Sequence, residues 1–186
     1  MEDVLKSILP SNTPWLVSES NVKSETEFNV ELRLTKCSAL ECKQWVNDFQ
    51  AKSRCDWNVR STFPRTSRWE WKCNYVCAHS QFNKCEKISS VRVKSTGCRA
   101  TMNIKLKRVT KDTCKKDRFV KQGFPTVVSL VWDHNHLVSS ADALSFRKPN
   151  VSVRNQFMGY FSEGMTASMS ISHHKNVIEM GETDDC

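Results

Sequence analysis

The chain has 186 residues and a net charge of +8, and charged residues make up 26% of it. This length allows one domain of ordinary size with tails, since domains commonly hold about 100–150 residues. No stretch reaches the roughly 18 apolar residues of a membrane helix, and the first ten residues lack the apolar run of a signal peptide. We therefore expect a soluble, intracellular protein with no membrane partner.

The N-terminal residues 1–37 are expected to form a flexible leader. The stretch as far as Leu34 is rich in Ser, Asn and Glu, contains two prolines and shows little hydrophobic periodicity. Such a composition buries too little apolar surface to offset the entropy lost on folding.

Residues 38–138 are expected to form an α+β domain. A helix is predicted over about 39–51, because apolar residues recur at helical spacing after Ser38, the N-cap, and Glu41 completes a capping box. The turn-like segment 63–68 is expected to join the first two strands as a hairpin. Strands rich in β-formers are predicted at 56–62, 69–77, 100–108 and 126–133. The expected fold is a small four-stranded sheet with a preceding helix.

Residues 139–186 are expected to form a helical linker and tail. A helical pattern starts at Ser140–Phe146 and is interrupted by Pro149. A second amphipathic helix is predicted from about Val153 to Gly164. The last twenty residues show no convincing core.

Charge is unevenly distributed along the chain. The segment from Lys52 to Lys121 holds 19 Lys and Arg against 5 Asp and Glu, whereas the rest holds 9 against 15. A basic middle favours nucleic acid, because cationic side chains gain affinity by releasing the counterions condensed on phosphates. The alternatives are a solvated basic surface or a localisation signal within 105–121.

The nine cysteines must suit a reducing compartment. Disulfides do not persist there, so metal ligands or buried thiols are expected instead of a bridged scaffold. Four residues stand out by their spacing, namely Cys77, Cys98, His134 and His136. Thiolate and imidazole are the ligands that zinc prefers, and two histidines two apart on a strand end share a face. One zinc ion is therefore the expected cofactor.

Other readings of these residues remain open. Cys73 or Cys85 could replace Cys77 as a ligand, since both lie in the same cysteine-rich stretch. The cysteines could also be ordinary buried thiols and the histidines surface residues of a turn.

Three segments around these residues resemble a known superfamily. They read Tyr75-Val76-Cys77-Ala78-His79, Thr96-Gly97-Cys98-Arg99-Ala100 and Asp133-His134-Asn135-His136-Leu137. Over about residues 38–170, the chain is similar to the zinc fingers of the WRKY and glial-cells-missing superfamily, with its far-red-impaired factors and Mutator-like transposases. The resemblance implies a four-stranded antiparallel sheet that binds zinc through an aromatic-x-Cys strand, a Gly-Cys-x-Ala step and a terminal His-x-His. It also implies a transposon-derived animal protein.

The resemblance further implies that an exposed strand edge enters the DNA major groove, which is wide enough for a β-ribbon. The equivalent region is the first hairpin, whose candidates for DNA contact are Arg60, Arg65, Arg68 and Lys72. Candidates for phosphate contact are Arg92, Lys94, Arg99, Lys105, Lys107 and Arg108. The lysine-rich segment 111–121 is expected to add salt-sensitive affinity. The hairpin tryptophans Trp57, Trp69 and Trp71 are expected to pack in the core.

We therefore expect a zinc-dependent, sequence-specific binder of double-stranded DNA, located in the nucleus and acting in transcription regulation, with no small-molecule substrate. The alternative is a zinc-stabilised module that binds RNA or another protein. An enzyme is not expected, because no orienting group or oxyanion element accompanies a Cys77–His79 pair. The sequence also ends before a transposase catalytic core could begin.

Overall fold

The computed structural model describes residues 1–82, 95–138, 147, 149 and 151–181. The chain divides into two units, Met1–Arg147 and Lys148–Cys186. The first unit contains α1 (Glu2–Ile8), β1 (Trp15–Val22), β2 (Glu27–Leu34), α2 (Ala39–Ser53), β3 (Trp57–Phe63), β4 (Trp69–Cys77), β5 (Thr101–Lys107), α3 (Lys111–Lys116), α4 (Arg118–Lys121) and β6 (Thr126–Asp133). None of the helices in the described ranges combines the length and apolar character of a membrane span.

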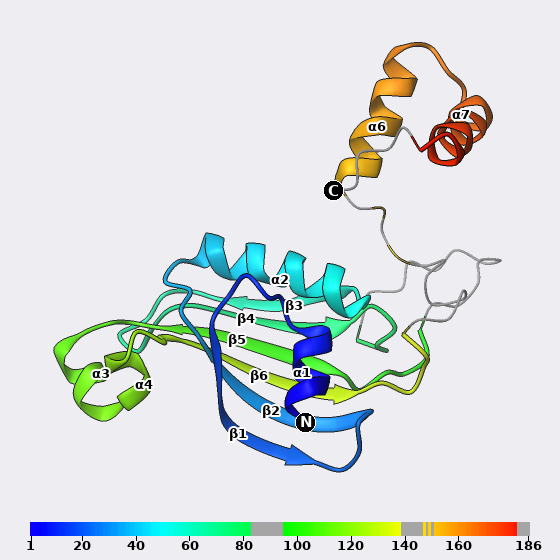
Figure 1. Cartoon of the computed structure of the whole chain (residues 1–186). Helices are drawn as coiled ribbons and strands as arrows, with labels where there is room; N and C mark the ends of the chain where they lie inside the picture. Colours follow the sequence, from blue (N-terminus) through cyan, green and yellow to red (C-terminus); the bar gives the residue numbers. More distant parts are fainter. Residues whose placement is uncertain (83–94, 139–146, 148, 150, 182–186) are drawn as a thin grey trace. The chain divides into compact units, whose positions relative to one another are not determined.

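The centre of this unit is a six-stranded sheet in the order β1-β2-β6-β5-β4-β3 (Figure 1). Every neighbouring pair of strands is antiparallel. The mixed α+β class agrees with the expectation, but the four-stranded sheet was wrong. All four predicted strands are present, and two more are added by residues that precede them.

The two additional strands come from the expected leader, so the prediction of a flexible segment over 1–37 also needs correction. In β2, Phe28, Val30 and Leu32 are at most 4% exposed and point toward the core. They alternate with Asn29 and Glu31, which is the period-two pattern of a strand with one wet face. Because β2 pairs with β6, these apolar side chains face the core of the sheet. The composition of residues 1–37 alone does not predict this pairing.

Helix α2 covers one face of the sheet (Figure 1). Its start agrees with the sequence, since the Ser38 hydroxyl accepts a hydrogen bond from the Glu41 backbone N–H at 3.1 Å. The Glu41 carboxylate accepts from the Cys37 N–H at 3.0 Å. In a standard capping box it would accept from the N–H of the N-cap residue Ser38, so this contact lies one residue earlier than expected. Trp45 and Phe49 turn toward the sheet and are fully buried. Helix and sheet therefore share one core.

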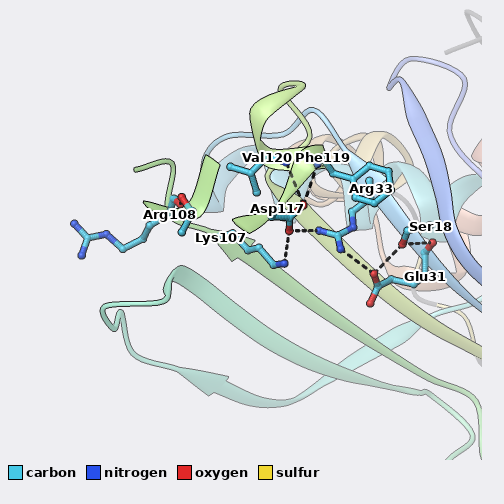
Figure 2. Close-up of polar contacts among 9 residues, drawn as sticks. Ser18, Glu31, Arg33, Lys107, Arg108, Asp117, Phe119 and Val120 are labelled. Atoms are coloured by element: carbon cyan, nitrogen blue, oxygen red, sulfur yellow. Dashed lines mark hydrogen bonds and ion pairs between the residues drawn. The ribbon is translucent and has the colours of Figure 1, made fainter. Parts of the chain in front are cut away.

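Helices α3 and α4 form the connection between β5 and β6 and lie at one end of the sheet (Figure 1). Asp117 joins this connection to two strands, because its carboxylate bonds Arg33 of β2 at 3.0 Å and also Lys107 of β5 (Figure 2). The same carboxylate accepts hydrogen bonds from the backbone N–H groups of Phe119 and Val120 and so caps α4. One half-buried acid thus contacts both helices and two strands.

The carboxyl of Asp117 gives the first testable prediction. Burial alone would raise its pKa, but the hydrogen bond from Lys107 and the charge of Arg33 outweigh burial and lower the pKa to about 2. Since one pKa unit corresponds to about 1.4 kcal/mol, Asp117→Asn should reduce the free energy of unfolding by about 2 kcal/mol at pH 7. A carboxyl with a lowered pKa stabilises the fold above its unfolded pKa of about 4 and loses this effect as the pH falls through about 2.

Urea unfolding of both proteins at pH 7 and pH 5 measures this difference. The gap in free energy of unfolding between the parent and Asp117→Asn should be the same at pH 7 and pH 5, because both pH values lie above the unfolded pKa of the carboxyl. Any pH dependence common to the two proteins cancels in the gap. A gap that closes between pH 7 and pH 5 would show that another group is responsible.

The boundary between the two units lies at residue 147, later than the expected 138. Arg147 belongs to the first unit because its guanidinium contacts the Asp56 carboxylate at 3.4 Å and donates to the Gln50 carbonyl at 3.2 Å. The helical start predicted at Ser140–Phe146 lies outside the described residues.

The second unit contains two helices, α6 (Val151–Ser162) and α7 (Ala167–Glu179). Helix α6 corresponds to the predicted amphipathic helix. The Thr166 hydroxyl caps α7 by accepting from a backbone N–H of its first turn. Helix α7 lies in the last twenty residues, where no core was expected. The two helices contact each other through aromatic pairs such as Tyr160 with His173, whose ring centroids are 4.8 Å apart.

Candidate metal centre

The four predicted ligands come from the same end of three adjacent strands. Cys77 is the last residue of β4, Cys98 precedes β5, and His134 and His136 follow β6. Because β4, β5 and β6 are neighbours in the sheet, these positions meet at one edge. One ligand atom from each residue lies within 4.8 Å of all the others. The structure thus forms a cluster of two cysteines and two histidines that could bind a metal ion.

Three distances within the cluster are close to the edges of a tetrahedron around zinc. The Cys77 Sγ lies 3.3 Å from His136 Nε2, and the Cys98 Sγ lies 3.4 Å from His134 Nδ1. The two imidazole nitrogens are 3.3 Å apart. Bonds of about 2.3 Å to sulfur and about 2.0 Å to nitrogen give tetrahedral edges of about 3.6 Å between S and N and about 3.3 Å between two N atoms. These three distances are therefore close to those of a zinc site, and the four ligand atoms together lie within 4.8 Å of one another.

The pKa values of the two thiols are shifted in opposite directions. A hydrogen bond from the Cys77 thiol, together with contacts from His134 and His136, lowers the pKa of Cys98 to about 2. The same hydrogen bond, followed by burial, raises the pKa of Cys77. A dication between the two sulfurs would favour the thiolate form of both, which is the form that binds metal.

Backbone groups around the two sulfurs reinforce this arrangement. The His79 N–H donates to the Cys77 Sγ at 3.4 Å. The carbonyl of His79 accepts from the Cys98 N–H at 3.3 Å, which ties the two ligand-bearing segments together. Gly97 stands directly before Cys98 with a φ of +72°, a left-handed conformation that favours glycine. The backbone is thereby shaped to bring the second cysteine to the first.

The ring of His134 is held from several sides. Its Nε2, on the side away from the cluster, lies 3.8 Å from the Cys55 Sγ. The Trp132 and Trp57 rings contact it edge-on, with centroids at 4.5 Å and 5.9 Å. Contacts of this kind fix the orientation of a metal-binding imidazole. No role was predicted for Cys55, although it lies two residues before Trp57, which pairs with Cys77 in the hairpin.

Asn135, between the two histidines, was not singled out from the sequence. Its side-chain oxygen accepts from the Thr96 hydroxyl at 2.8 Å, and its amide donates to the Thr96 carbonyl at 2.6 Å. This double contact joins the segment before Cys98 to the one that carries both histidines. Only the tertiary structure reveals it, because the partners are 39 residues apart.

The alternative ligands do not join this cluster in the described residues. Cys73 lies in the middle of β4, where it pairs with Ile104 of β5, and its Sγ contacts the Thr62 hydroxyl at 3.6 Å. It lies four positions before Cys77 on the strand, which is a distance of about 13 Å. Cys85 lies outside the described residues.

The cations predicted to contact DNA fall into distinct environments, and the first group lies on the β3–β4 hairpin, where Arg60 and Arg68 are exposed and Lys72 is half-buried. Arg60 lies on β3 with its guanidinium 4.0 Å from the centroid of the Phe82 ring. Arg68 is exposed in the turn before β4. The Lys72 ammonium lies 4.4 Å from the centroid of the Phe63 ring. These side chains keep their charge near the surface.

A second group forms ion pairs. The Glu70 carboxylate contacts Arg65 at 3.1 Å and Arg108 at 3.7 Å, which joins the hairpin to the end of β5. Arg99 pairs with Asp133 at 3.0 Å, close to the cysteine–histidine cluster, although its side chain remains largely exposed. These ion pairs partly neutralise the arginines, so each attracts an external anion more weakly.

The remaining predicted cations are more enclosed. Lys105 is half-buried, and burial, followed by the charges of nearby lysines, lowers its pKa. Lys107 is engaged by Asp117. The two other predicted contacts, Arg92 and Lys94, lie outside the described residues.

The hairpin tryptophans have structural roles. Trp57 and Trp71 are 5% and 9% exposed, so both are core residues as expected. Trp69 is half-buried, and its indole N–H donates to the Pro64 carbonyl at 3.1 Å across the turn. The Thr66 hydroxyl accepts from two backbone N–H groups of the same turn. The hairpin therefore presents its cations on a rigid support.

Comparison with family models, with curated proteins and with solved structures finds no match for this chain. What the protein can bind must therefore be inferred from its own geometry and charge.

Proposed function

We propose that the first unit is a zinc-dependent domain that binds double-stranded DNA through the β3–β4 hairpin. The proposal also includes sequence-specific recognition and a role in transcription regulation in the nucleus. The observation that carries it is the basic β3–β4 hairpin (the ribbon), which forms the edge of the six-stranded sheet. Within the described ranges, β3 pairs only with β4, so its outer side is open.

The shape of the hairpin supports this proposal. The major groove of B-DNA is about 12 Å wide and admits a β-ribbon. Because β4 is also paired with β5, the parts of the hairpin free to enter the groove are β3 and the turn. Arg60 and Arg68 are exposed on these parts, and arginine can pair bidentately with guanine. Glu70 is the one acidic residue between Trp57 and Cys77. The surface therefore combines the shape, the charge and the hydrogen-bond donors that base recognition needs.

The candidate metal centre would hold this ribbon in place. Cys77 ends β4, so a metal ion bound there would fix the ribbon to β5 and β6 at the end opposite the turn. Structural zinc sites use four protein ligands and leave no open position for a substrate. This closed ligand set favours a structural ion in a binding module over a catalytic metal.

The direct test is the affinity of Arg68→Ala for duplex DNA. A duplex is first selected from a random-sequence pool with the parent protein, and binding is then followed by fluorescence anisotropy at fixed salt. Loss of one base-contacting arginine should weaken binding by about 1–3 kcal/mol, which is roughly 5- to 150-fold. The matched control Lys43→Ala removes an exposed cation from α2 and should bind like the parent.

Two results would contradict the proposal. A parent protein that selects no duplex sequence overturns DNA recognition and leaves RNA or a protein as the partner. If Arg68→Ala and Arg60→Ala both keep the parental affinity, the hairpin is not the recognition element.

A further inference from the structure

The α3–α4 connection carries exposed cations that the ribbon does not account for. They lie within eleven residues and are Lys111, Lys115, Lys116, Arg118 and Lys121. None of them forms an ion pair with a described residue. The nearby acids differ in their availability, since Asp112 is exposed, whereas Asp117 is occupied by Arg33 and Lys107. The connection is therefore a compact source of positive potential.

This basic connection lies next to the turn of the β3–β4 ribbon. Trp69, the first residue of β4, pairs with Lys107, the last residue of β5, and the connection starts directly after it. Glu70 contacts both Arg65 of the turn and Arg108 of the connection. The two segments thus form one basic surface at the end of the sheet far from the metal ligands.

The orientation of the connection is set by a buried arginine. Arg33 is 8% exposed, and its guanidinium bonds Asp117 at 3.0 Å and Glu31 at 3.1 Å (Figure 2). The Phe119 ring of α4 packs against it, with the guanidinium carbon 4.8 Å from the ring centroid. The Ser18 hydroxyl donates to Glu31 at 2.8 Å and holds the far side of the network.

Such a network is a poor source of stability compared with apolar packing. Burying charged groups costs desolvation energy, and well-packed apolar replacements are often equally stable or better. A planar guanidinium held by two carboxylates and an aromatic ring does, however, fix geometry closely. The network is thus suited to hold α3 and α4 at one angle to the sheet.

We propose that α3 and α4 bind the phosphate backbone of the duplex beside the groove that the ribbon enters, and that Arg33 and Asp117 are positioning residues for this contact. This inference rests on the proposed DNA binding of the β3–β4 ribbon. The cations of the connection would contact phosphates, and the ribbon would read the bases. Affinity and recognition are thereby divided between two adjacent segments.

The first test measures the salt dependence of duplex binding. Each phosphate contact contributes about 0.9 to the slope of log K against log salt. The double variant Lys115→Gln, Lys116→Gln should lower the slope by about 2 and keep the parental sequence preference. The matched control Lys43→Gln, Lys52→Gln removes two exposed cations from α2 and should keep the parental slope.

The second test uses Asp117→Asn. For this variant, the change in charge and the loss of positioning predict opposite changes in DNA affinity. Removal of an acid raises the net charge by one, so a purely electrostatic effect would tighten DNA binding. Loss of the fixed geometry should instead weaken binding and make the salt slope shallower. Asparagine can still cap α4, so the fold should be retained, and near-ultraviolet circular dichroism checks this.

The outcomes separate this inference from the function on which it rests. A parent that binds no duplex overturns both. A parent that binds, with an Arg68→Ala defect but an unchanged slope for the Lys115 and Lys116 double variant, overturns the phosphate contact alone. Tighter binding by folded Asp117→Asn overturns the positioning role.

Discussion

Replacing Cys98 with alanine is expected to abolish metal binding and to unfold most of the first unit. Cys98 is 1% exposed, and its Sγ lies 3.4 Å from His134 Nδ1 inside the candidate metal centre. Structural zinc contributes on the order of 10 kcal/mol to small fingers, whereas a whole domain is stable by about 5–15 kcal/mol. The loss is therefore comparable to the total stability, and His136→Ala should behave in the same way.

Thermal unfolding followed by circular dichroism measures this effect. At about 2–4 °C per kcal/mol for a domain of this size, the variants should be unfolded at room temperature or melt at least about 20 °C below the parent. Cys37→Ala is the control, because Cys37 is exposed and lies outside the cluster. Melting curves of Cys98→Ala and His136→Ala that overlay the parent would contradict the metal centre.

Truncation of Phe49 should give the second large effect. Its ring is fully buried in α2, stacks on Trp45 with centroids 5.2 Å apart, and reaches Trp57 and Trp132 at 6.1 Å and 6.3 Å. Both of these sheet tryptophans contact the His134 ring. Phe49 therefore links the helix, the sheet and the support of one metal ligand.

Phe49→Ala should lower the free energy of unfolding by about 3–5 kcal/mol, because it removes a large buried ring and leaves a cavity. Urea unfolding in the presence of zinc measures the change. Leu40→Ala on the same helix is the matched control, since Leu40 is 78% exposed and should change stability by less than about 0.5 kcal/mol. Equal effects of the two substitutions would mean that α2 does not pack on the sheet as described.

Sequence patterns predicted the strands with strong local signals. The bounds of β4 and β6 agree with the prediction, because both segments are rich in β-branched and aromatic residues and are flanked by turn residues. The capped start of α2 was predicted for a similar reason, since Ser38 and Glu41 form their hydrogen bonds locally. Strand β1 has no such signal: six of its eight residues are exposed, and it is stabilised by pairing with β2.

The clustering of the candidate metal ligands could be predicted because their positions follow from strand order. A cysteine at the end of one strand, a cysteine at the start of the next and a His-x-His after a third converge when the strands are antiparallel neighbours. Whether an individual cation is paired or free to bind an anion could not be predicted in this way. Arg33 finds its partner Asp117 84 residues away, so nothing local distinguishes a buried, paired arginine from one that is free to bind an anion.

The most direct test of the account is the metal content of protein purified without a metal-affinity tag, measured by elemental mass spectrometry beside Cys98→Ala and His134→Ala. The account predicts one equivalent of zinc in the parent and none in either variant. A parent that is folded but free of metal would contradict the centre on which the proposed DNA-binding ribbon depends.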